Sequence, residues 1–208
     1  MPPGPVRNLT AIIESSGGII FSLPLETDKF DALSLWAPKM PPVIFVNENF
    51  PGDRLRFNLA HEIGHLIMHG VPSPRQEEEA DRFASEFLMP AEEIRPQLSK
   101  LTFDRLATLK TYWRISMQAL IRRAHTLGLI SERQQRTFFM NMSSNGWRKK
   151  EPIDIPLEKP SILRSLVDVH LKEHAYTIAE LCEAIRASPE DFRRDYLDRT
   201  QPDLRLFF

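Results

Sequence analysis

The chain has 208 residues, which is enough for one fair-sized domain or for a domain with a smaller appendage. Its 27 basic and 28 acidic residues nearly balance, and this argues against a general binder of polyanions, although local basic patches remain compatible with it. The single cysteine, Cys182, excludes an intramolecular disulfide and a thiolate cluster, so any bound metal must be held by histidines and carboxylates.

The first fifty residues predict a short helix and a small sheet. A helix is expected at residues 6–16. Three short apolar runs bounded by Pro, Asp or Asn then predict strands at Ile19–Leu25, Ala32–Trp36 and Val43–Val46. Pro41 and Pro42 precede the third run, and we expect it to be an edge strand because a proline cannot donate a backbone hydrogen bond.

From Asp53 the apolar residues recur at helical spacing. This helix is expected to stop at Gly70, Pro72 and Pro74, and a second helix to run from about Gln76 to Met89 before Pro90. Further helices are predicted at 91–98, 102–110, 116–127, 131–139, 161–174, 177–186 and 189–197.

The polar break at Ser143–Gly146 and the basic, proline-punctuated stretch Trp147–Pro160 indicate a linker. We therefore expect an α+β fold, in which a small antiparallel or mixed three-stranded sheet packs on the two long helices and a mostly helical C-terminal part follows. The predicted parts are a domain at 1–100, a helix-turn-helix-like unit packed on it at 101–145, a linker at 146–160 and a C-terminal helical segment at 161–208.

The segment His61-Glu62-Ile63-Gly64-His65 predicts a metal site. Residues four apart share one face of a helix, so His61 and His65 can place two imidazole nitrogens on one cation. Glu62 lies beside the open coordination position, where it can take a proton from water. Zinc suits such a site because it accepts histidine and carboxylate ligands in tetrahedral geometry. A bare H-E-x-x-H pattern is only moderately specific, and two solvated histidines on an exposed turn are the alternative.

A third ligand is expected from the helix that follows. His69 is nearer in sequence, but three positions over two turns of a straight helix span about 12 Å, which is too far for one ion. We therefore interpret His69 as a structural residue or as a partner of a ligand. The returning helix begins Glu77-Glu78-Glu79-Ala80-Asp81. Glu77 is our predicted ligand, Glu79 is the alternative and Glu78 is expected to be solvated. Asp81 is expected to hold a ligand histidine by its other ring nitrogen. An acidic turn that only complements the helix dipole would also account for the glutamates.

Several of these segments together resemble a known family. Leu59–His65, then Glu77, Ala80-Asp81 and Phe83-Ala84, then Leu88-Met89-Pro90 are similar to the motifs of the ImmA/IrrE metallopeptidases. The strand residues Ile44–Asn47 and the pair Arg56-Phe57 also resemble its pattern, so the likeness covers roughly residues 40–90. It implies a gluzincin-like, zincin-type domain, Zn²⁺ bound by His61, His65 and Glu77, and Glu62 as the catalytic general base.

The resemblance also implies a biological setting. Such peptidases cleave a partner protein, a helix-turn-helix repressor or an antitoxin encoded nearby, and so relieve repression in a stress or mobile-element response. The alternative is a zinc-stabilised protein that binds a repressor or DNA without cutting. Residues 102–130 carry the DNA-binding alternative, with Arg122 and Arg123 expected to be exposed, but one basic pair gives little affinity for phosphates. An extended substrate pairing with the Val43–Val46 edge strand is a further hypothesis.

The N-terminal residues Met1–Pro5 lack the charged lead and long apolar run of a signal peptide. No stretch approaches the roughly 20 apolar residues that cross a bilayer. We therefore expect a cytoplasmic protein with no membrane partner.

Overall fold

The computed structural model describes residues 3–25, 27, 29–71 and 73–197. Pro72 of the predicted helix stop and residues 198–208 of the predicted C-terminal segment lie outside the described residues. The chain divides into two compact units. The first joins the chain up to Leu9 with Phe50–Glu158, and the second joins Thr10–Asn49 with the chain from Lys159 onward. The domain boundaries expected from the sequence stay a prediction.

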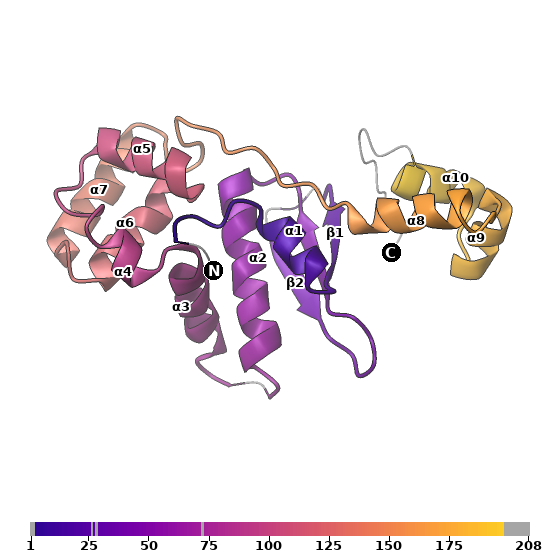
Figure 1. Cartoon of the computed structure of the whole chain (residues 1–208). Helices are drawn as coiled ribbons and strands as arrows, with labels where there is room; N and C mark the ends of the chain where they lie inside the picture. The colour runs from indigo at the N-terminus through magenta and orange to yellow at the C-terminus, as the bar shows by residue number, and fades with distance from the viewer. Residues whose placement is uncertain (1–2, 26, 28, 72, 198–208) are drawn as a thin grey trace. The chain divides into compact units, whose positions relative to one another are not determined.

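The first unit is helical. Its helices are α2 (Gly52–Met68), α3 (Gln76–Leu88), α4 (Ala91–Ile94), α5 (Phe103–Trp113), α6 (Met117–Thr126) and α7 (Glu132–Ser144). The hydroxyls of Thr102, Ser116 and Ser131 accept backbone N–H bonds at the starts of α5, α6 and α7, as N-cap residues do. In Figure 1, α2 and α3 run side by side in opposite directions.

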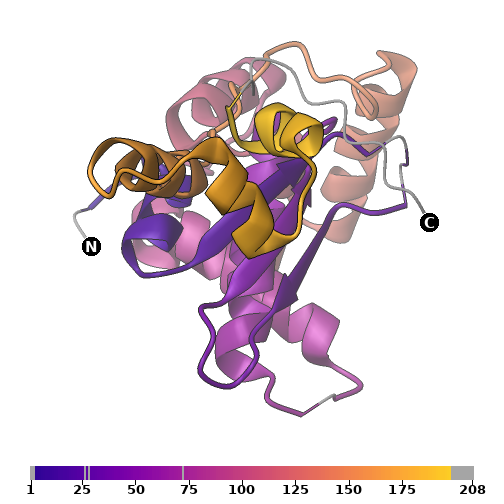
Figure 2. The ribbon, with the colours of Figure 1, turned by 90° about the vertical axis from the view of Figure 1, so that its right-hand side faces the viewer.

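The second unit contains the sheet and the last helices. Its elements are α1 (Leu9–Ser15, which begins at the unit boundary), β1 (Ile19–Leu23), β2 (Ala32–Leu35), β3 (Val43–Asn47), α8 (Ile162–Lys172), α9 (Ile178–Ile185), α10 (Pro189–Phe192) and the π-helical turn η1 (Arg193–Leu197). Figure 2 shows α8 to α10 as one group of short helices in orange and yellow. The carboxylate of Glu14 on α1 accepts from the backbone N–H groups of Ser161 and Ile162 and so caps α8.

The three strands form a mixed sheet in the order β1-β3-β2. β3 pairs parallel with β1 and antiparallel with β2. The predicted α+β class with a small mixed sheet is confirmed, whereas the packing of this sheet on the two long helices stays a prediction.

The prediction that Val43–Val46 is an edge strand is wrong. β3 is the central strand, and the prolines are accommodated because they precede it, the carbonyl of Pro42 accepting from the Ile19 amide at 2.9 Å. Residues Val43–Val46 are apolar on both faces of β3, a pattern more typical of a central strand than of an edge strand. Its backbone groups already pair with β1 and β2, so the hypothesis of a substrate strand added to β3 is also wrong.

Asn47 at the end of β3 organises the connection between β1 and β2. Its side chain is fully buried and satisfied: the Oδ1 accepts from the amides of Leu25 and Asn49, and the Nδ2 donates to the carbonyls of Thr27 and Phe30. A buried amide with every hydrogen bond made specifies one loop conformation.

Two buried charge clusters fix the start of α2 within the first unit. Lys110 of α5 donates to Asp53 and, at 2.7 Å, to Glu151, and all three side chains are at most 7% exposed. Glu151 also accepts from the Met117 amide at the start of α6. Arg56, one turn after Asp53, pairs with Glu158 and donates to the carbonyl of Val6. The segment expected to be a linker therefore supplies two buried carboxylates.

Residues 102–130 form two helices, α5 and α6, joined by a short turn, but the structure does not establish a DNA-binding unit. Arg122 is exposed as expected. The expectation that Arg123 is exposed is wrong. Its side chain is only 3% exposed, it pairs with Glu86 of α3, and it donates to the carbonyl of Met89 at 2.8 Å. The second cation therefore caps the end of α3 and is not presented to a ligand.

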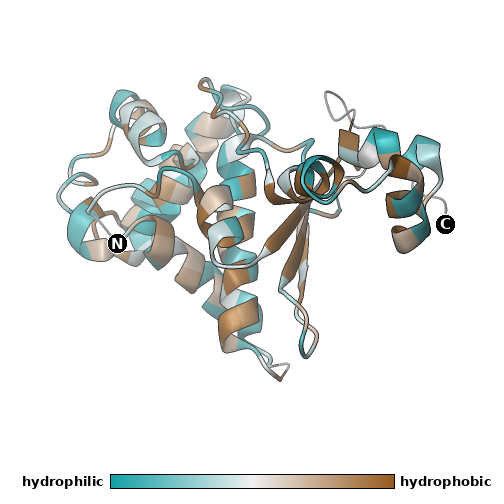
Figure 3. Cartoon of the chain, turned by 45° about the vertical axis from the view of Figure 1, so that its right-hand side comes forward, coloured by the Kyte–Doolittle hydropathy of each residue, from teal (hydrophilic) through white to brown (hydrophobic). Residues whose placement is uncertain are grey.

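Apolar residues concentrate in the strands and alternate with hydrophilic residues along the helices, as the brown and teal segments of Figure 3 show. Within the described part of the chain, no helix combines the length and the apolar character that a membrane span requires.

Replacing Lys110 by Met should destabilise the fold. The substitution leaves Asp53 and Glu151 buried without their shared cation, and we expect the free energy of unfolding to fall by about 3 kcal/mol. Urea unfolding of Lys110→Met measures this, with the exposed Lys149→Met as the matched control, expected to change by less than about 0.5 kcal/mol. Equal stabilities of the two variants would contradict the buried cluster.

The Glu86–Arg123 pair predicts a pH effect. Burial alone would raise the pKa of the Glu86 carboxyl, but hydrogen bonds from the Ala91 amide and Arg123 outweigh it, and the pKa lies below its ordinary value of 4.5. A lowered pKa contributes stability that is present above the unfolded value and lost as the pH falls through the folded value. Wild type should therefore exceed Glu86→Gln in stability at pH 7, and this difference should shrink below about pH 4.5. A difference that stays constant down to pH 3 would contradict the pair.

Candidate metal centre

The imidazoles of His61 and His65 meet on one face of α2. They lie one helical turn apart, and their Nε2 atoms are 2.9 Å from each other. Both side chains are partly shielded, at 18% and 19% exposure. The two nitrogens therefore converge on one point.

Helix α3 can approach this face closely because Gly64, one of the three residues between the two histidines, has no side chain. A Cβ on Gly64 would lie 3.2 Å from the Cα of Ala80 and 3.2 Å from Cδ1 of Phe83. Ala80 and Ala84 are both fully buried. Small residues on both helices thus allow the backbones to come together, and the first turn of α3 lies beside the histidines.

Glu77 on that first turn joins the two histidines. One of its carboxylate oxygens is 3.3 Å from Nε2 of His61, and the other is 3.5 Å from Nε2 of His65. One ligand atom from each of the three residues lies within 4.8 Å of the others. Four ligand atoms about 2.1 Å from a zinc ion are about 3.4 Å apart. The spacing and the nitrogen and oxygen chemistry of the three side chains thus fit a tetrahedral divalent metal.

Asp81 makes a hydrogen bond with Nδ1 of His61. Its Oδ1 lies 2.8 Å from Nδ1 of His61, leaving the Nε2 of the ring for the site. The hydrogen bond to Asp81 raises the pKa of His61 above its ordinary value, against a smaller opposing effect of burial. The contact is compatible with the expected role of Asp81 beside a ligand histidine, and that role stays a prediction.

His69 and Glu79 lie outside the three-residue group. Nδ1 of His69 is 3.0 Å from Nδ1 of His65, and its Nε2 is 3.2 Å from Oε2 of Glu79. Of the two glutamates that the sequence left open, Glu77 faces the paired nitrogens and Glu79 faces His69. Glu78 is exposed.

Glu62 lies next to His61 on α2 and is half-buried. Its charge contributes to raising the pKa of His61, so it acts within electrostatic range of the site. A carboxylate at this place can accept a proton from water at the metal position.

The H-E-x-x-H pattern and the geometry of the His-His-Glu group agree with the family to which the sequence is similar. The model of the IrrE N-terminal-like domain, a peptidase family designated M78, matches residues 13–125, which is more than half of the chain. The chain belongs to this peptidase family. The resemblance to the ImmA/IrrE metallopeptidases is thereby confirmed. No curated protein matches the chain.

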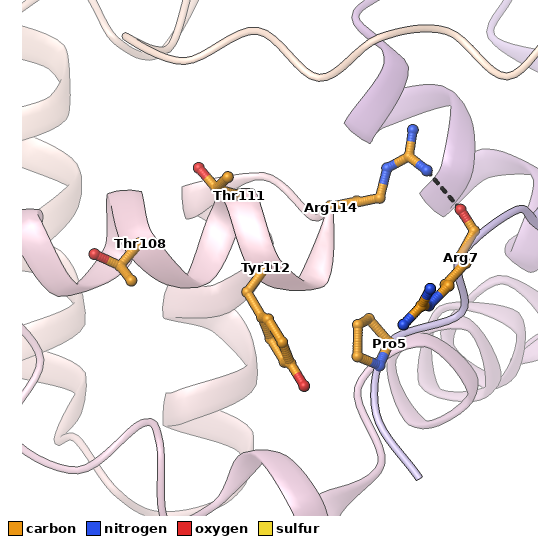
Figure 4. Close-up of a pocket in the computed structure, with 6 residues that line it drawn as sticks. All are labelled: Pro5, Arg7, Thr108, Thr111, Tyr112 and Arg114. Carbon is orange, nitrogen blue, oxygen red and sulfur yellow. Dashed lines mark hydrogen bonds between the residues drawn. The ribbon is translucent and has the colours of Figure 1, made fainter. Parts of the chain in front are cut away.

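This M78-family chain also has an open depression of about 730 Å³ in its first unit. It is lined by Pro5, Arg7, Thr108, Thr111, Tyr112 and Arg114 (Figure 4). Arg114 turns away to donate to the carbonyl of Arg7, and the hydroxyls of Thr108 and Thr111 donate to the backbone of their own helix. None of the residues of the His-His-Glu group lines this depression.

The sequence did not reveal the pairing of His69 with Glu79. The spacing of His65 and His69 was the available signal, because residues four apart share a helix face. It could not identify Glu79 as the second partner, since that contact depends on how α3 lies against α2.

Enlarging Gly64 should separate the two helices of this family's site. In Gly64→Val the new side chain meets the backbone of Ala80. We expect the free energy of unfolding to fall by about 1–3 kcal/mol. Zinc binding should also weaken, because Glu77 moves away together with α3. Gly70→Val is the matched control, since a Cβ there meets nothing within 4 Å. Denaturant unfolding and chelator competition provide the measurements, and an unchanged Gly64→Val would argue against the close approach.

Proposed function

We propose that this chain is a zinc-dependent endopeptidase that cleaves a regulatory protein. The observation that carries the proposal is the convergence of the His61 and His65 Nε2 atoms with the Glu77 carboxylate, next to Glu62, in a chain of a peptidase family. Such a constellation serves hydrolysis because it combines metal ligands with a carboxylate that can move a proton.

Each side chain has a distinct task. His61, His65 and Glu77 would hold the zinc, and Asp81 keeps His61 oriented through its Nδ1. Bound zinc lowers the pKa of water and polarises the carbonyl of the scissile peptide. Glu62 accepts a proton from the attacking water as the new C–O bond forms. It then delivers that proton to the amide nitrogen as the C–N bond breaks, so that the products are an amine and a carboxylic acid, which loses its own proton at neutral pH.

We propose a helix-turn-helix repressor or an antitoxin encoded nearby as the substrate, with cleavage relieving repression in a stress or mobile-element response. Membership of the IrrE N-terminal-like family supports this class of partner. Such a partner would place the protein in the cytoplasm.

The alternative is a protein that binds a repressor or DNA without cutting. Its DNA-binding form needs an exposed basic surface on α5 and α6. The burial of Arg123 against Glu86 and Met89 removes one of the two cations that were expected there. With Arg123 buried, Arg122 is all that remains of the expected basic pair, and one such cation contributes little phosphate affinity, which favours the peptidase.

Glu62→Gln separates the two functions. The amide cannot take up the proton, and we expect cleavage to fall by about 10²–10⁴-fold while zinc binding is retained. The test is co-expression with a candidate helix-turn-helix regulator, followed by intact-mass analysis of its fragments and metal analysis of the purified variant.

Glu78→Gln is the matched control, because Glu78 is an exposed glutamate outside the His-His-Glu group, and it should cleave as wild type does. Full inactivation of the partner by zinc-loaded Glu62→Gln would overturn the peptidase and leave the binding protein.

A further inference from the structure

His61 and His65 differ in the group that contacts their Nδ1 atoms. His61 contacts a carboxylate directly, through Asp81. His65 instead contacts a second imidazole, that of His69, which contacts the carboxylate of Glu79. The side chain of His69 is 7% exposed, so these are its partners in place of water.

The positions of the ring nitrogens allow one consistent arrangement of protons when the site holds a metal. A ligand nitrogen must carry a lone pair, so Nε2 of His65 is unprotonated and its proton is on Nδ1. That N–H donates to Nδ1 of His69 over 3.0 Å, which requires a lone pair on that atom. The proton of His69 is then on Nε2, which donates to Oε2 of Glu79 over 3.2 Å.

The reverse arrangement is incompatible with ligation. If His69 donated from Nδ1, the neutral His65 would carry its proton on Nε2 and could not bind a metal there. The carboxylate of Glu79 prevents this, because it accepts hydrogen bonds and so favours the tautomer of His69 with its proton on Nε2. Glu79 therefore determines the state of His65 through His69.

The backbone holds the same pair of rings in place. His69 is the C-cap of α2, and its amide donates to the carbonyl of His65 at 3.0 Å. The main chain and the side chain of His69 thus both contact His65. The other ring nitrogen of His69 contacts Glu79. Glu79 lies on α3, the helix that also carries Glu77 and Asp81, so the same helix supplies this contact and two other side chains of the site.

We propose that His69 and Glu79 are positioning residues, a two-membered relay that fixes the tautomer and the ring orientation of His65 as a metal ligand. The proposal rests on the metal centre of the proposed function and extends it to two residues that bind no metal. Outer partners of this kind are worth about 10–100-fold in metal affinity.

The test measures zinc affinity of the full-length chain by chelator competition. His69→Leu removes both hydrogen bonds and should weaken zinc binding about 10–100-fold. His69→Gln should remain within a few-fold of wild type, because its amide can accept from His65 and donate to Glu79. Glu79→Ala should weaken binding in the same direction as His69→Leu, whereas Glu78→Ala, at the adjacent exposed carboxylate, should have no effect.

The double variant His69→Leu/Glu79→Ala should bind zinc no more weakly than His69→Leu, since both changes break one relay. In the zinc-loaded wild type, ¹⁵N NMR of the imidazoles should show His69 protonated on Nε2 and not on Nδ1. Unfolding curves of the metal-free variants show whether each is folded. Should His69→Leu fail to fold, His69→Gln, Glu79→Ala and the NMR tautomer decide the question.

Three results would overturn the relay. The first is a zinc affinity of His69→Leu equal to that of wild type, and the second is a loss of zinc affinity in His69→Gln as large as that in His69→Leu. The third is a proton on Nδ1 of His69 in the NMR spectrum. These outcomes are distinct from failure of the proposed function. A chain that binds zinc, responds to His69→Leu as expected and yet leaves its partner uncut retains the relay and loses the peptidase.

Discussion

The close antiparallel approach of α2 and α3 is the constraint on which the candidate site depends. At the point of contact Gly64 has no side chain and Ala80 has only a methyl group, so the two helix backbones can pack closely. This close packing brings a side chain of α3 next to the imidazoles of α2. Gly64, between His61 and His65, is thus part of the candidate site although it contributes no side chain, because its lack of a Cβ lets α3 bring Glu77 close.

The two ends of α2 are held in different ways. Its first turns are held within the first unit by charges, Asp53 with Lys110 and Arg56 with Glu158, all removed from water. Ion pairs of this kind are expensive to break because either partner alone would be a buried charge. Its last turns carry the histidines: Asp81 of α3 contacts His61, Glu79 of α3 contacts His69, and His69 contacts His65. A start fixed by buried ion pairs and an end that carries the histidines suit a site whose side chains must keep their positions.

Much of the fold was predictable, and the exceptions share a cause. The helices and strands were predicted to within a few residues, because period, caps and prolines act locally. The edge position given to Val43–Val46 was wrong, since strand order depends on partners distant in sequence, although the apolar run on both faces was a signal for a central strand. The exposure given to Arg123 was wrong for the same reason, because Glu86 and Met89 approach it only in the folded chain.

The sequence by itself determined the pair of histidines and the glutamate between them, because four-residue spacing on a helix fixes which side chains share a face. It also predicted that the third side chain of the group would come from another helix, since His69 lies too far along the same one. Only the tertiary structure decided which glutamate faces the site. Glu77 and Glu79 are two residues apart on α3, so they point in different directions, and the packing of α3 on Gly64 directs the first toward the paired nitrogens and the second toward His69.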